Sequence, residues 1–121
     1  MKVIRTEQVP KQPATSSLFT GGPVTLQPIV TQQMRKYFGM SLVNFSKGAR
    51  TKLHSHTSDQ VLLVTAGTGI VATEQEELVV RVGDIIYIPV GEKHWHGATK
   101  DSEFSHIYVV SAGNETTELE D

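Results

Sequence analysis

Apolar and polar positions alternate along this chain in short runs that are separated by turn-forming residues. From Val24 onward, about nine runs rich in β-branched and aromatic residues follow one another roughly ten residues apart: VTLQPIV, YFGMSLVNF, RTKLHSH, QVLLVTAG, GIVATEQ, ELVVRV, DIIYIPV, KHWHGAT and FSHIYVV. Their separators, SKG, TSD, GTG, QEE, VGD, GEK and KDSE, are typical turn sequences. This spacing predicts an all-β sandwich or small barrel. Only residues 31–37 offer a helical turn, and a loop fits them equally well.

Two of these runs are apolar at every successive position. They are Val61–Val64 and Ile85–Ile88, the second of which includes Tyr87. A strand with one wet face would alternate, so we expect both faces of these strands to be covered. The barrel interior covers one face, and a second subunit would cover the other, which favours a homodimer. The alternative is a monomer in which the N-terminal segment covers them.

The chain divides into a barrel and two terminal segments. In residues 1–22 a short strand at Lys2–Thr6 precedes prolines and paired glycines that exclude a helix. We expect this segment to lie along the body or across a partner subunit. Residues 23–112 form the barrel. Residues 113–121 are acidic and polar, so we expect them to fray.

Composition narrows the function classes. A chain of 121 residues with net charge −2 and no block of Lys or Arg gives no reason to expect nucleic acid or an anionic membrane as a partner. No stretch approaches the roughly 20 apolar residues of a membrane span, and the N-terminus lacks the apolar core of a signal peptide, so we expect a cytoplasmic protein. The chain has no cysteine. Any metal would therefore be bound by histidine and oxygen donors.

All five histidines fall within residues 54–106. Four of them form two His-x-His pairs, His54 with His56 and His94 with His96. Side chains two apart in a strand point to the same face, so each pair can approach one ion from one wall. Gln60 follows the turn-like TSD and opens the next strand. Isolated histidines are usually structural, but two such pairs in one β chain predict a metal site.

The two histidine segments resemble the conserved motifs of the cupins. Gly48, His54-x-His56, Gln60 and Gly67 match the first motif in spacing, and Gly83, Pro89-x-Gly91 and His94 match the second. The resemblance implies a double-stranded β-helix, or jelly-roll barrel, that is often dimeric. It also implies His54, His56, Gln60 and His94 as ligands of one divalent transition metal.

Two residues depart from the usual cupin motifs. Gln60 stands where glutamate is usual, and Ala98 stands where asparagine often follows the second motif. Gln60 is either a ligand or a pocket hydrogen-bonding group with water completing the metal's coordination. Because three imidazoles and an amide are neutral, the ion keeps its full charge, which favours holding an anion over reaching a higher oxidation state. Histidine and oxygen donors suit Mn, Fe, Ni, Co or Zn.

A closer resemblance connects the chain with small bacterial cupins. Five segments resemble the corresponding segments of manganese-dependent hydroxynitrile lyases and of cupins associated with carboxymuconolactone decarboxylases. These segments are GARTKLHSH, VLLVTAG, PVGEKHWHGA, FSHIYV and LFTGGPVTLQPIV. This resemblance implies manganese and lyase or decarboxylase chemistry on a small, anionic or anion-forming substrate. A metal-dependent dioxygenase, a sugar-acid isomerase and a non-catalytic ligand-binding cupin remain alternatives.

Four further side chains are candidates for the pocket. His96 is expected to face the cavity as a general base or fifth ligand, or else to be a rim histidine bonded to water. His106 is either a core residue or a second proton carrier beside the cavity. Arg50 and Lys52 share parity with His54 in a regular strand, so either could bind a substrate carboxylate, although solvated strand ends fit as well. Trp95 points away from the histidines and is expected to pack.

Overall fold

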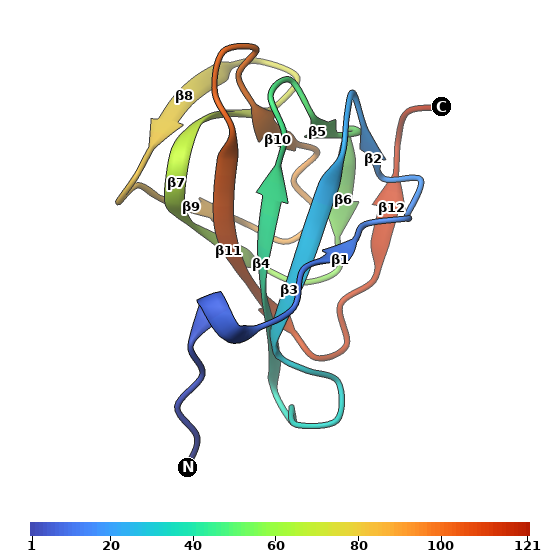
Figure 1. The fold of residues 1–121 in the computed structure, drawn as a ribbon. Coiled ribbons are helices and arrows are strands. Elements are labelled where there is room, and N and C mark those ends of the chain that lie inside the picture. Colours follow the sequence, from blue (N-terminus) through green and yellow to red (C-terminus); the bar gives the residue numbers. More distant parts are fainter.

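The computed structural model describes residues 1–121 and is built almost entirely of strands (Figure 1). One 3-10 turn, η1 (Thr6–Gln8), precedes the strands, which in chain order are β1 (Gln12–Pro13), β2 (Phe19–Thr20), β3 (Val24–Val30), β4 (Phe38–Phe45), β5 (Arg50–Thr51), β6 (His54–His56), β7 (Gln60–Ala72), β8 (Glu77–Arg81), β9 (Ile85–Ile88), β10 (Trp95–Ala98), β11 (Phe104–Ser111) and β12 (Thr116–Glu118). No helix has the length and apolar character needed to cross a membrane. The predicted all-β class is confirmed.

The strands form one curled sheet and a small two-stranded sheet beside it (Figure 1). The curled sheet has the order β1-β3-β4-β11-β7-β10-β5-β2, with β8 and β9 also paired to β7, while β12 pairs with β6. The first part of β7 pairs with β9 and β11, and its last part pairs with β8 and β10. β7 therefore belongs to both faces of the barrel and joins them.

The sequence predicted two strands where β7 is one. GTG was expected to separate QVLLVTAG from GIVATEQ, but Gln60–Ala72 is continuous. Gly67 has φ +71°, and a Cβ there would lie 1.7 Å from the Glu103 carbonyl oxygen. Gly69 lies against the Phe104 ring, which a Cβ would meet at 2.6 Å. The glycines therefore bend the strand around the core without ending it.

The core fills the inside of the curled sheet. Alternate residues of β4 point inward, as the regular burial of its successive positions shows. The largest fully buried apolar side chains are Phe45, Phe104 and Leu62. Phe45 stacks on Phe104 with ring centroids 5.8 Å apart and also contacts His96 and His106. The core therefore supports the histidine-bearing strands directly.

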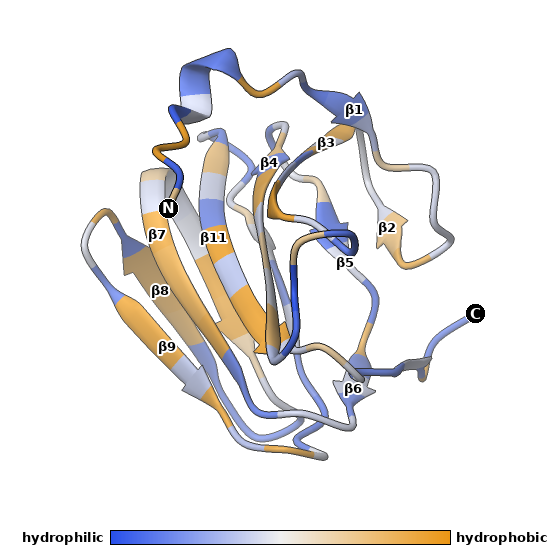
Figure 2. Cartoon of the chain, turned by 90° about the horizontal axis from the view of Figure 1, so that it is seen from below, coloured by the Kyte–Doolittle hydropathy of each residue, from blue (hydrophilic) through white to orange (hydrophobic).

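The outer face of β8 and β9 is apolar and uncovered in the single chain. Figure 2 shows hydrophobic stretches along both strands, and Ile85 is 68% exposed while Tyr87 is 62% exposed. The N-terminal segment does not cover this face, because β1 pairs with β3 and the Gln27 amide donates to the Thr6 and Val9 carbonyls. The N-terminal segment therefore does not cover the Ile85–Ile88 run, contrary to what the monomer alternative expected.

The terminal segments differ from their predictions in local structure. Lys2–Thr6 is not a strand, and a 3-10 turn forms at Thr6–Gln8, ahead of the first proline. The segment still contributes β1 and β2 to the sheet. The acidic C-terminal segment does not fray from the barrel, because Thr116–Glu118 pairs with β6. Residues 31–37 form a loop of turns and no helix, and Tyr37 accepts a hydrogen bond from the Ala112 amide.

Candidate metal site and cavity

Backbone pairing brings the two histidine segments together. His54 and His56 both lie on the buried face of β6. The amide of His54 donates to the carbonyl of His94 at 2.9 Å, and the amide of His94 donates to the carbonyl of His54 at 2.9 Å. This isolated bridge fixes His94 opposite His54 through their own backbones. The predicted convergence of the two motifs is confirmed for these residues.

The three imidazoles form a compact, buried cluster. One ring nitrogen from each of His54, His56 and His94 lies within 4.8 Å of the others. Their ring centroids are 4.3 Å apart for His54 and His94, 4.8 Å for His54 and His56, and 5.3 Å for His56 and His94. Three converging nitrogens are the donor arrangement of a metal site.

Hydrogen bonds at Nδ1 leave Nε2 free on each ring. His54 Nδ1 donates to the Lys52 carbonyl at 2.7 Å, and His94 Nδ1 donates to the Glu92 carbonyl at 2.8 Å. His56 Nδ1 lies 3.0 Å from Thr116 Oγ1. Because a carbonyl can only accept, Nδ1 of His54 and His94 carries the proton and Nε2 presents a lone pair. The Nε2 atoms of His56 and His94 are buried with no hydrogen-bond partner.

Asn114 adds a second contact behind His56. Its Nδ2 lies 3.3 Å from His56 Nδ1, while its Oδ1 is buried without a partner. Two donors cannot share one hydrogen bond, so an Nδ1–H on His56 requires the amide turned with Oδ1 towards the ring. This orientation also gives the Oδ1 atom its partner. The C-terminal segment thus holds His56 from behind.

Gln60 is a candidate fourth donor. It is the first residue of β7, and its Oε1 atom is buried with no hydrogen-bond partner. An amide oxygen left unpaired in a buried site costs free energy unless a ligand satisfies it. Orphaned atoms on Gln60, His56 and His94 therefore fit a divalent cation, and no carboxylate joins the three-histidine cluster.

Burial keeps these histidines neutral at neutral pH. Desolvation, followed by repulsion from the neighbouring histidines, lowers the pKa of His54 to about 3. The same causes lower the pKa of His56 to about 4. Desolvation also lowers the pKa of His94. Neutral imidazole is the form that binds a metal.

His96 faces the cavity, whereas His106 lies behind it. His96 lines the cavity and its ring centroid is 5.5 Å from that of His54. His106 is 0% exposed and does not line the cavity; its Nε2 lies 3.0 Å from His96 Nδ1. His106 is therefore a core residue, which is one of the two alternatives for it. Because His96 Nδ1 contacts His106, only Nε2 of His96 is available to a ligand. Desolvation lowers the pKa of His96 well below its usual value and that of His106 to about 4.

Arg50 and Lys52 do not line the cavity, contrary to the prediction from strand parity. The strand β5 ends at Thr51 and β6 begins at His54, so parity is not preserved between them. Thr51, not Lys52, is buried and lines the cavity. Arg50 lies 4.1 Å from the Trp95 ring centroid and pairs with Glu120 at 2.7 Å. Trp95 packs outside the cavity, as predicted.

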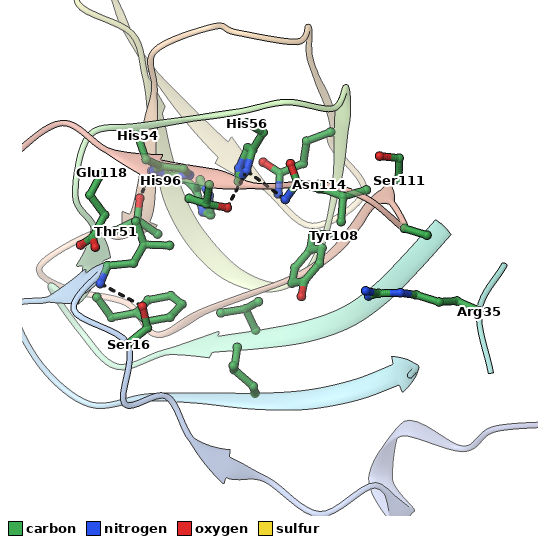
Figure 3. Close-up of a pocket in the computed structure, with 18 residues that line it drawn as sticks. Ser16, Arg35, Thr51, His54, His56, His96, Tyr108, Ser111, Asn114 and Glu118 are labelled. Atoms are coloured by element: carbon green, nitrogen blue, oxygen red, sulfur yellow. Dashed lines mark hydrogen bonds between the residues drawn. The ribbon is translucent and has the colours of Figure 1, made fainter. Parts of the chain in front are cut away.

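The cavity beside the histidines has a volume of about 410 Å³ and extends well beyond them (Figure 3). Lining residues that the sequence did not single out as pocket residues include Arg35, Thr51, Tyr108, Asn114 and Thr116. Tyr108 and Val110 share strand parity with His106, which could have indicated their direction. No local pattern points to Arg35 or to the C-terminal residues.

A β-barrel with three converging histidines and an adjoining cavity has the features of the cupin class. A cupin domain family model matches residues 41–111, and the chain belongs to this family. The (R)-mandelonitrile lyase of Granulicella tundricola is 34% identical over 89 residues, covering 73% of this chain and 68% of that enzyme.

Solved structures agree with this assignment. A cupin-like protein from Thermotoga maritima has a TM-score of 0.81 at 33% identity, with 88% of this chain and 83% of that chain covered. The polyketide cyclase RemF from Streptomyces resistomycificus has a TM-score of 0.89 at 16% identity, covering 100% of this chain and 87% of that chain. At that identity the likeness shows the fold alone. The predicted cupin fold is confirmed.

Proposed function

We propose that the protein is a metal-dependent lyase that cleaves or forms a bond beside an oxygen-bearing carbon, as hydroxynitrile lyases do. The observation that carries this proposal is the neutral donor set of His54, His56, His94 and Gln60 beside a cavity that also contains His96. The likeness to (R)-mandelonitrile lyase supports it. Manganese is the ion we propose, with Fe, Ni, Co and Zn as chemically compatible substitutes.

A bound divalent ion would polarise a substrate oxygen and stabilise negative charge there. In the cleavage of a cyanohydrin, the bond between the carbinol and nitrile carbons breaks and its electron pair leaves with cyanide. The hydroxyl loses its proton as the carbonyl forms. We assign the uptake of that proton to His96 Nε2, and the proton then passes to cyanide to give HCN.

His106 acts on this step through His96. When His96 is protonated, its Nδ1–H can donate to the lone pair of His106 Nε2 at 3.0 Å. The contact also fixes the orientation of the His96 ring. His106 is therefore a positioning residue, whereas the sequence left open a role beside the cavity.

The deciding experiment combines metal analysis with a cleavage assay. Purified protein should contain one divalent ion per chain, and the manganese-loaded form should release benzaldehyde and HCN from mandelonitrile. His96→Ala should abolish the release without removing the metal. Oxygen consumption with candidate substrates would indicate a dioxygenase, and isomerised sugar acid an isomerase. Ligand binding without turnover of any substrate would indicate a binding protein.

We also propose that a second copy of the chain covers the apolar outer face of β8 and β9. Exposed contiguous apolar surface marks association sites, and the exposed side chains concerned are Val79, Val82, Ile85, Tyr87 and Val90. Light scattering should give a dimer mass. Ile85→Lys should yield a monomer with unchanged metal content; a wild-type monomer would contradict the proposal.

A further inference from the structure

The cavity contains a guanidinium group that has no partner within the chain. Arg35 lines the cavity from the loop between β3 and β4. The ion pairs of the structure are Arg50 with Glu120 and Lys93 with Glu74, and the Arg35 side chain makes no hydrogen bond. A half-buried cation with five free donors is suited to an anionic ligand.

The local structure directs this side chain towards the cavity. The amides of Met34 and Arg35 donate to the Thr31 carbonyl at 3.0 and 3.1 Å, which closes the turn. The side chain then passes over Gly39, where a Cβ would lie 3.0 Å from Nη1 and 3.7 Å from Cδ. Glycine at position 39 thus leaves room for the arginine on the surface of β4. Figure 3 shows the guanidinium aimed at the Tyr108 hydroxyl.

The charges in the cavity favour an anion. Arg35 and Glu118 are its charged lining residues. The Glu118 carboxylate accepts a hydrogen bond from Ser17 Oγ at 2.7 Å. In Figure 3, Glu118 lies at the end of the cavity away from Arg35. With neutral ligands, a bound ion would keep its full positive charge. Both the histidine side and the Arg35 side of the cavity then attract negative charge.

The cavity also has an apolar part to its lining. Leu26, Val43 and Val110 contribute apolar lining to the cavity, and Tyr108 lies between Arg35 and the histidines in Figure 3. A cavity of about 410 Å³ is far larger than cyanide or formate requires and falls within the range of small-molecule sites. Its three regions suit a ligand with a reacting oxygen group, a short apolar body and a terminal anion.

We propose that the natural substrate is a small organic carboxylate whose carboxylate group binds Arg35 and whose hydroxyl or carbonyl group reaches the histidine site. This inference rests on the proposed lyase function for the reacting end and on Arg35 for the carboxylate end. Guanidinium binds carboxylate through two parallel N–H···O bonds, which makes the interaction both strong and orientation-specific. Arg35 would thus hold the reacting carbon at a fixed distance from His96.

The test compares a carboxylate with its neutral ester on the full-length, manganese-loaded protein. The probes are 4-formylbenzoate and methyl 4-formylbenzoate, with binding measured by calorimetry. Wild type should bind the acid about tenfold or more tightly than the ester. Arg35→Gln should reduce this preference to within twofold, and Arg35→Lys should retain part of it. Lys36→Gln removes the same charge from a neighbouring position outside the cavity and should preserve the preference.

Metal content and thermal unfolding confirm that each variant is folded and loaded. Equal binding of acid and ester by wild type, or a full preference in Arg35→Gln, would overturn the carboxylate inference. If wild type cleaves mandelonitrile but shows no preference, the inference fails and the proposed function stands. If the preference is present but no cyanohydrin is cleaved, the proposed function fails and the carboxylate site stands.

Discussion

Replacing Thr116 with valine removes the hydroxyl that lies 3.0 Å from His56 Nδ1 while keeping the side chain's shape. Thr116 lies opposite His56 in the β12–β6 pair. The substitution therefore alters the group behind a proposed ligand without altering a ligand. We expect weaker metal binding, because the ring's orientation and its Nδ1–H are less well held.

The size of the expected loss in metal affinity depends on which hydrogen-bond partners remain around the His56 ring. Loss of a neutral hydrogen bond costs about 1 kcal/mol, and a fully unsatisfied buried donor costs up to about 3 kcal/mol. Asn114 lies 3.3 Å from the same nitrogen and can still accept through Oδ1. The single variant should therefore lose roughly tenfold in metal affinity, and the double variant with Asn114→Ala roughly a hundredfold.

The assay is a competition titration of metal-free protein with manganese and a chelator of known affinity. The visible spectrum of the cobalt-loaded protein reports the coordination geometry independently of activity. Thr117→Val is the matched control, because Thr117 is on the same strand and pairs with Ser55, which is not a proposed ligand. Equal affinities for Thr116→Val, Thr117→Val and wild type would refute the role of the C-terminal segment in positioning His56.

Further predictions concern charge, pH and the bend in β7. Gln60→Glu should bind the ion more tightly but lower the rate of cyanohydrin cleavage, because the added carboxylate reduces the site's positive charge; metal titration and HCN release check both. Metal-free protein should lose stability as the pH falls from 6.5 towards 4, because the pKa of His106 is about 4 when folded and the unfolded chain binds its proton first. His106→Gln should reduce that loss by up to about 3 kcal/mol in denaturant titrations at pH 7 and pH 4, and an unchanged loss would contradict the assignment. Gly67→Ala should unfold the protein or destabilise it by more than about 3 kcal/mol, since its Cβ would meet the Glu103 carbonyl oxygen at 1.7 Å. Gly113→Ala, with no atom within 4 Å of its Cβ, should be nearly neutral by thermal unfolding.

Local sequence patterns predicted the features that depend on neighbouring residues. The spacing of His54 and His56 two apart on one strand is a local property, and so is the β character of the apolar runs. Arg35 and Thr116 could not be found this way. They reach the site through the loop before β4 and through the β12–β6 pairing, which joins residues about sixty positions apart in the chain.

Strand parity failed where the strand itself was interrupted. Parity assumes one regular strand over Arg50–His54, but Lys52 and Leu53 lie between two separate strands. Arg50 and Lys52 consequently lie outside the cavity and Thr51 lies inside. The opposite error occurred at GTG, where turn-forming residues permit a bend that continues the strand. The break between β5 and β6 and the continuation of β7 through GTG both depend on tertiary contacts, which the periodicity of the sequence does not reveal.

The paired backbone hydrogen bonds between His54 and His94 bear on how the protein would acquire the proposed metal. Because these two residues are joined through their own amides and carbonyls at 2.9 Å, the barrel organises the donors and the ion need not do so. The cost of ordering the ligands is met during folding, unlike in zinc fingers, where the metal drives folding. The empty barrel would therefore be a ready receptor, and the ion it carries would follow the supply of divalent metals at the time it is filled.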